Sequence, residues 1–147
     1  MYGTYETYKR KRPFHRFMRL ILMAGPVVMT VSLMSACQSA VAINADKGVK
    51  AYLADDYATA IEKWRPPAEA GDSESQLYLG MMYFNGNGVK RNHVIAYMWA
   101  NLAANQGNKA SFRIRDFISS NMTKAQIAEG QRLSRECIAR NYKNCAR

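Results

Sequence analysis

The sequence contains little histidine and cysteine, which restricts the chemistry that it can perform. Its 147 residues include two histidines and three cysteines, and only His93 among the histidines follows residue 42. A structural zinc site needs about four cysteine or histidine ligands, more than these residues offer. The hydrolase patterns Gly-x-Ser-x-Gly, Ser-x-x-Lys and His-Glu-x-x-His are also absent. We therefore predict no metal, no cofactor and no catalytic residues.

Strand-like patterning is also missing after residue 42. No stretch there alternates apolar and polar side chains with the period of two that a half-buried strand requires. Apolar residues nevertheless make up 48% of the chain, which is enough for a packed core. The sequence therefore predicts an all-α domain.

Acidic residues are scarce at the N-terminus, where residues 1–42 carry six Lys/Arg and one acid. These cations precede an apolar run at residues 20–36, which is the pattern of a secretion signal. We predict that residues 1–42 form a signal peptide or lipoprotein leader and that residues 43–147 form an exported domain. A start at Met18 would give a leader of conventional length, so both Met1 and Met18 remain candidate starts.

Two cleavage sites fit this leader. Residues 34–37 resemble a lipobox, in which Cys37 would be lipidated and would attach the protein to a membrane, whereas Ala42 ends a small-x-small site for ordinary signal peptidase. The expected location is the periplasm or the envelope membrane. Cys137 and Cys145 remain, and we predict that they form a disulfide. Eight helical residues span about 12 Å, which exceeds the Cα–Cα distance of about 7 Å that a disulfide allows. The helix must therefore end between the two cysteines, and Asn141 suits that role.

Local signals divide residues 43–147 into successive helices. Glycine residues that favour the position after a helix C-cap end two of them, at Gly71 and Gly107. The adjacent prolines Pro66 and Pro67 should kink, narrow or interrupt the second helix, because proline lacks a backbone donor. The expected helix starts are Asp46, Asp55 or Asp56, Ser73, Asn92, Asn108 and Thr123, with Ser73–Gln76 and Thr123–Gln126 as capping boxes.

The run LYLGMMYFNGNGVKRN at residues 77–92 contains three glycines, which permits two interpretations. A phosphate-binding loop would need Lys and a hydroxyl directly after its last glycine, but Gly88 is followed by Val-Lys-Arg. A turn between helices needs glycine for positive φ angles, which Gly86 and Gly88 supply. We favour the turn, with Gly80 allowing a neighbouring helix to approach closely.

Small residues recur at an offset of 36, which is typical of stacked helix pairs. Residues 71–107 then resemble a Sel-one-like repeat, a relative of the tetratricopeptide repeat. The residues that carry the resemblance are Ser73, Ser75, Gln76, Leu79, Gly80, Tyr83, Gly86, Gly88, Val89, Ala96, Trp99, Ala103, Ala104 and Gly107. Serines at 73 and 75 replace the usual alanines, and Asn92 replaces the usual Asp.

The resemblance implies a short right-handed α-solenoid of antiparallel helix pairs. Residues 45–70 would be a degenerate repeat, residues 71–107 a full repeat, and residues 108–147 capping helices. Trp64 and Trp99 are expected to pack between helices, since each buries on the order of 200 Å².

The implied function is non-catalytic binding of a protein or peptide on the concave face of the solenoid, in the bacterial cell envelope. Tyr78, Met81 and Phe84 are spaced three apart on the first helix of the full repeat and are the predicted contact residues. Residues 109–147 carry nine Lys/Arg and three acids, which we interpret as a solvated face; no nucleic acid or small-molecule substrate is expected. The alternatives are a basic lipoprotein that tethers envelope layers and a small enzyme acting on the cell wall.

Overall fold

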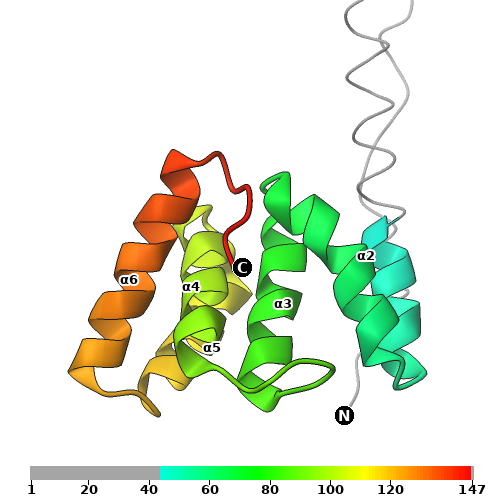
Figure 1. Ribbon diagram of the computed structural model, residues 1–147, viewed down its shortest axis with the longest axis horizontal. Coiled ribbons are helices and arrows are strands. Elements are labelled where there is room, and N and C mark those ends of the chain that lie inside the picture. Colours follow the sequence, from blue (N-terminus) through cyan, green and yellow to red (C-terminus); the bar gives the residue numbers. More distant parts are fainter. Residues whose placement is uncertain (1–43, 147) are drawn as a thin grey trace, which may run out of the picture.

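The computed structural model describes residues 44–146, and every regular element in that range is a helix. A first helix covers residues 44–53. The helices that follow are α2 (Tyr57–Glu69), α3 (Ser73–Asn85), α4 (His93–Asn105), α5 (Lys109–Ser119) and α6 (Lys124–Ala139). The helices lie roughly alongside one another, with α3 and α4 between α2 and α6, and α5 overlaps α4 in this view (Figure 1). The predicted all-α solenoid is confirmed.

The core lies along α3 and α4. Helix α3 packs against α2 and α4, and α4 packs in addition against α5 and α6. Trp64 and Trp99 are only 2% and 0% exposed, so both pack between helices as predicted. The Trp64 Nε1 donates to the carbonyl of Ala45, 3.2 Å away, and so joins α2 to the first helix.

Side chains cap the N-termini of the helices at most of the predicted positions. Asp56 caps α2, Asn92 caps α4, Asn108 caps α5, and Thr123 forms a capping box with Gln126 at α6. Each side chain accepts backbone N–H groups that the first helical turn leaves without partners.

The predicted capping box at Ser73 is wrong. Asp72 caps α3 instead, by accepting from the N–H of Ser75 at 2.8 Å. Gln76 is fully buried and does not reach back to the cap. Its Nε2 donates to the Ala68 carbonyl at 3.0 Å, and its oxygen accepts from Gln106 Nε2 at 2.7 Å. Gln76 therefore links the ends of α2 and α4, which a pattern read along a single helix does not reveal.

The two adjacent prolines do not end α2, which continues through Pro66 and Pro67 to Glu69. They lie in the last turn, and because neither has an N–H, the two carbonyls that lie four residues before them lose their usual donors. Their carbonyls accept from the residues that close the helix, Pro66 from Ala70 and Pro67 from Ala70 and Asp72, at 2.9–3.0 Å.

The glycines at 80, 86 and 88 serve the geometry of the α3–α4 hairpin. Gly86 and Gly88 have φ angles of 81° and 69°, which confirms the turn conformation that the sequence predicts. A Cβ on Gly80 would lie 3.2 Å from the Ala96 carbonyl oxygen and 3.3 Å from the Ala100 nitrogen. The absence of a side chain at Gly80 therefore allows α3 and α4 to approach closely at this point.

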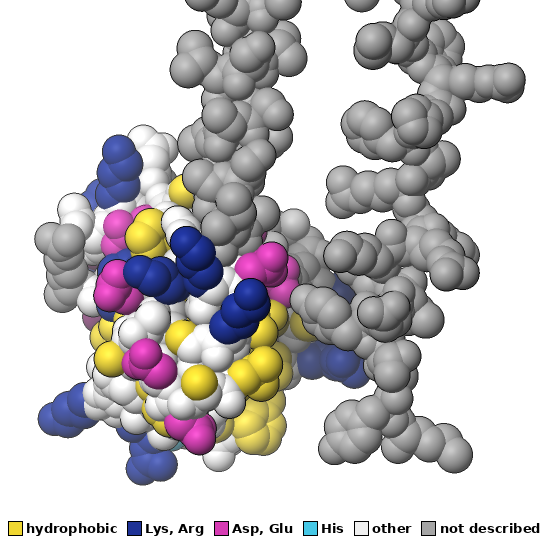
Figure 2. Space-filling model, turned by 90° about the vertical axis from the view of Figure 1, so that its right-hand side faces the viewer, with side chains coloured by type: hydrophobic (Ala, Val, Ile, Leu, Met, Phe, Trp, Pro, Cys, Tyr) yellow, Lys and Arg dark blue, Asp and Glu magenta, His cyan; other side chains and the backbone are white. Residues whose placement is uncertain are grey.

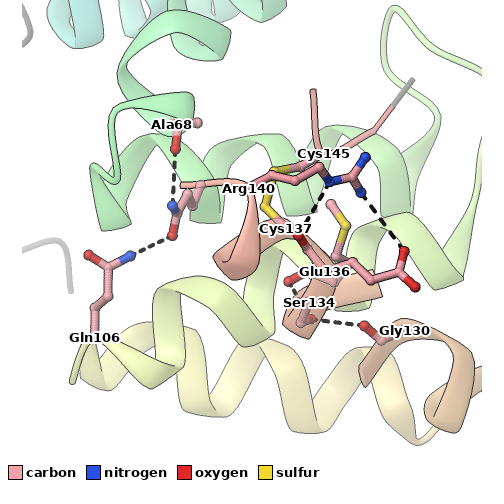
Figure 3. The surroundings of a disulfide bond; sticks show 10 residues. Ala68, Gln106, Gly130, Ser134, Glu136, Cys137, Arg140 and Cys145 are labelled. Atoms are coloured by element: carbon pink, nitrogen blue, oxygen red, sulfur yellow. Dashed lines mark hydrogen bonds and ion pairs between the residues drawn. A yellow bond between two sulfur atoms is a disulfide. The ribbon is translucent and has the colours of Figure 1, made fainter. Parts of the chain in front are cut away.

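The C-terminal segment returns from the end of α6 towards α3 (Figure 1). Asn141 has a φ of 51° and ends the helix, so that Cys137 and Cys145 form the predicted disulfide with a Cα–Cα distance of 5.0 Å (Figure 3). Tyr142 lies against Gly71, where a Cβ would be 3.6 Å from the ring. The disulfide thus fastens the C-terminal segment across the end of the stack at which α2 meets α3.

The predictions for the leader lie outside the described residues. They concern residues 1–42, the start at Met18, lipidation of Cys37 and cleavage after Ala42. Within residues 44–146, no helix is long and apolar enough to cross a membrane.

Candidate functional site

Tyr78, the first of the predicted contact residues, has a structural role in the stack. Its ring stacks on Trp64 with 4.6 Å between centroids, and its hydroxyl donates to Glu74 at 2.8 Å. The side chain is half-buried. Tyr78 thus joins α3 to α2, and its predicted part in binding stays a prediction.

Met81 and Phe84 lie further along α3, one turn apart and both half-buried. The Phe84 ring stacks on His93 at the start of α4, with 5.0 Å between centroids. Phe84 also meets the ring of Phe117 on α5 edge to face, at 5.3 Å. We call these four residues, Met81, Phe84, His93 and Phe117, the aromatic strip.

Phe117 is the most accessible aromatic member of this strip. Its side chain is 57% exposed although one edge of the ring contacts Phe84. A large apolar side chain exposed beside other partly exposed rings is typical of a binding surface, whereas single exposed apolar residues are ordinary. Aromatic residues and methionine are also enriched in protein interfaces.

The sequence alone did not predict His93 and Phe117 as members of this surface. The repeat offset of 36 could have found Phe117, because Phe117 follows Met81 by 36 residues and so occupies in α5 the repeat position that Met81 occupies in α3. His93 gives no such signal, since its contact with Phe84 depends on how the glycine turn directs α4 back along α3.

The other predicted repeat residues have structural positions. Gly107 has a φ of 83° and follows the C-cap of α4, as predicted. The remaining members of the set are buried in the core, with exposures between 0% and 8%: Leu79, Tyr83, Ala96 and Trp99.

Two exposed arginines stand within four residues of a member of the aromatic strip. Arg113 is exposed on α5, one turn before Phe117 and on the same side of the helix. Arg91 is exposed and lies two residues before His93. Within residues 44–146, neither arginine forms an ion pair, whereas Arg115 is paired with Asp116 at 2.9 Å.

The opposite end of the stack has a different charge balance. Residues 44–76 carry seven acids and four Lys/Arg, whereas residues 77–147 carry three acids and eleven Lys/Arg. The end that carries α2 shows acidic and basic side chains interspersed, with hydrophobic side chains between them (Figure 2). The excess of positive charge is thus concentrated in the half of the domain that contains the aromatic strip.

A metal site requires several ligating side chains close together. No group of three or more His, Cys, Asp or Glu side chains in residues 44–146 could hold a metal ion. The shifted pKa values belong to exposed groups with local causes. Hydrogen bonds from Thr59 lower the pKa of Asp56, and a hydrogen bond from Arg132 lowers that of Glu129.

Two comparisons with known proteins agree with the helical-repeat fold. The Sel1 repeat family matches residues 73–108. A protective antigen present in uropathogenic Escherichia coli strains, whose crystal structure displays an SLR fold, superimposes with a TM-score of 0.64 at 26% sequence identity. This is a Sel1-like repeat protein.

The shared region covers 75% of this Sel1-like repeat protein and 25% of the antigen's chain, so the protein corresponds to a quarter of that larger molecule. No curated protein matches it. The Sel1-like repeat fold is a type of protein-interaction module, which agrees with a surface that has an exposed aromatic side chain.

Proposed function

We propose that this Sel1-like repeat protein is a non-catalytic interaction module of the bacterial cell envelope that binds a segment of another protein on the aromatic strip. The observation that carries the proposal is the contact of Phe84 with both His93 and Phe117, which brings α3, α4 and α5 to one surface. Apolar anchors surrounded by polar residues contribute most of the affinity of protein interfaces.

The envelope location rests on the composition of residues 1–42 and on the disulfide. A basic segment followed by an apolar run is typical of exported proteins. Disulfides persist in oxidising compartments and are rare in the cytosol. Mass spectrometry of the mature N-terminus would test this and would distinguish a lipidated Cys37 from cleavage after Ala42; an intact leader on the cellular protein would contradict both cleavage sites and indicate a retained membrane anchor.

A pair of matched variants tests the site. Phe117→Ala removes the exposed ring of the strip, and Phe112→Ala removes an exposed ring that lies beside Arg115 on another side of α5. We expect quantitative capture from envelope extract to recover a protein that the unmodified chain and Phe112→Ala retain and Phe117→Ala loses. Equal recovery by both variants, each folded by circular dichroism, would contradict the proposed site.

A further inference from the structure

We infer that the segment bound by the aromatic strip is acidic and carries an aromatic or large aliphatic anchor. This inference rests on the proposed function and adds the chemistry of the partner. Two independent features of the surface carry it: the charges around the strip and the shape of its apolar part.

The charges favour an anionic segment. The three acids in residues 77–147 are all engaged in ion pairs, Asp116 with Arg115, Glu129 with Arg132, and Glu136 with Arg132 and Arg140. Arg91 and Arg113, which adjoin the strip, have no ion pair within the described residues. A carboxylate of a bound segment would therefore meet arginines whose donors are available, and arginine binds carboxylates through two parallel hydrogen bonds.

The apolar part of the strip favours an anchor. One edge of the Phe117 ring contacts Phe84, and Phe117 as a whole is 57% exposed. A partner side chain can therefore cover the exposed part of the ring without displacing an existing contact. Met81, half-buried on the α3 side, has a flexible side chain that adapts to different apolar shapes. In the free protein the exposed part of Phe117 is in contact with water, and a bound partner would remove that apolar area from water, which favours binding.

A protein segment fits this surface better than a lipid surface does. A membrane needs a broad cationic face, whereas the proposed surface is a small aromatic cluster that belongs to three helices and has two arginines beside it. An anionic lipid surface is therefore an outcome that the test must separate from the proposed one.

Selection from a random peptide library displayed on phage, against the purified full chain, tests the inference. We expect the enriched peptides to contain Asp or Glu next to an aromatic or large aliphatic residue. Their binding, measured by fluorescence anisotropy on synthetic copies, should weaken at least tenfold with Phe117→Ala and with Arg113→Glu.

Two control variants have the same chemical changes away from the strip. Phe112→Ala removes another exposed ring, and Arg135→Glu reverses an exposed charge on α6 with the same effect on net charge. Both should bind the selected peptides within about twofold of the unmodified chain. Circular dichroism and urea unfolding would show that all four variants remain folded.

The outcomes separate the inference from the proposed function. Peptides that depend on Phe117 but carry no excess of acids would overturn the inference and leave the proposed function standing. If no peptide depends on Phe117, both are overturned. If instead phosphatidylglycerol vesicles bind the chain and Arg113→Glu and Arg135→Glu weaken that binding equally, with no strip-dependent peptide, the surface serves a membrane and the inference is wrong.

Discussion

Single glycines and caps determine how this chain turns. The glycine turn after α3 and the caps Asp56, Asn92, Asn108 and Thr123 were predictable, because each acts through its own backbone or the next three residues. The role of Gln76 was not predictable, since its partners Ala68 and Gln106 come from other helices. Local rules thus located most helix ends. They were wrong for the first helix, which already includes residues 44 and 45 before the predicted start at Asp46, and they assigned Gln76 to the wrong hydrogen bonds.

Gly80→Ala tests the close approach of α3 and α4. Alanine favours a helix over glycine by about 1 kcal/mol, so intrinsic propensity predicts a gain in stability. The added Cβ, however, would press on backbone atoms of Ala96 and Ala100, which cannot move unless the helices separate. We expect the free energy of unfolding in urea to fall by about 1–3 kcal/mol. A rise of about 1 kcal/mol would show that the helices do not meet at Gly80.

Asp56 gives the domain a pH-dependent contribution to stability. Hydrogen bonds from Thr59 hold the pKa of Asp56 below its ordinary value of 3.8. A carboxyl with a lowered folded-state pKa stabilises the fold above its unfolded pKa, and this contribution is lost as the pH falls through the folded value. We therefore expect the loss to occur below about pH 4.

The matched variant Asp56→Asn separates the charge from the cap. Asparagine caps a helix about as well as aspartate does but does not titrate. The difference in unfolding free energy between the unmodified chain and this variant should be constant from pH 7 to pH 5 and should change below pH 4. A difference that stays constant down to pH 2 would contradict the assigned role of Asp56.

Among the helices, the packing of one helix depends on contacts with residues of its neighbours. Trp64 on α2 stacks on Tyr78 of α3 and donates to the first helix. The strip likewise depends on α4 and α5 returning to α3, which explains why Met81 and Phe84 could be proposed from spacing while His93 could not. The prolines of α2 show the same limit, because α2 continues through both of them to Glu69 although proline alone predicts a kink or an interruption.

The disulfide holds the C-terminal segment in place after α6. Asn141, Tyr142 and Asn144 all have positive φ angles, from 51° to 62°, a region that residues other than glycine rarely adopt. Because cross-linking a short loop restricts the unfolded chain, replacing Cys137 and Cys145 together by alanine should lower the unfolding free energy by about 2–3 kcal/mol.

Limited proteolysis provides a local readout of the same double variant. Loss of the disulfide should release Tyr142 from Gly71 and make residues 141–146 sensitive to trypsin, while α3 and α4 stay protected. Unchanged resistance of the C-terminal segment would show that packing alone holds it.

At the scale of the whole molecule, the fold was more predictable than its binding surface. The 36-residue offset and the glycine positions indicated stacked helix pairs, and the Sel1 repeat at residues 73–108 and the SLR-fold antigen agree with this. The charge separation between residues 44–76 and residues 77–147 was also present in the sequence, but its meaning depends on which cations adjoin the strip. That adjacency is a property of the assembled helices.

Site-specific photocrosslinking would show whether the aromatic strip is the surface that meets a partner. A photoreactive phenylalanine would be placed at Phe117, and in separate chains at Phe112 and Ile138, which are 41% and 42% exposed away from the strip. After irradiation of cells that produce these chains, we predict a covalent adduct with another protein from position 117 and none from positions 112 and 138. Adducts of equal yield at all three positions, or no adduct at position 117, would contradict the account.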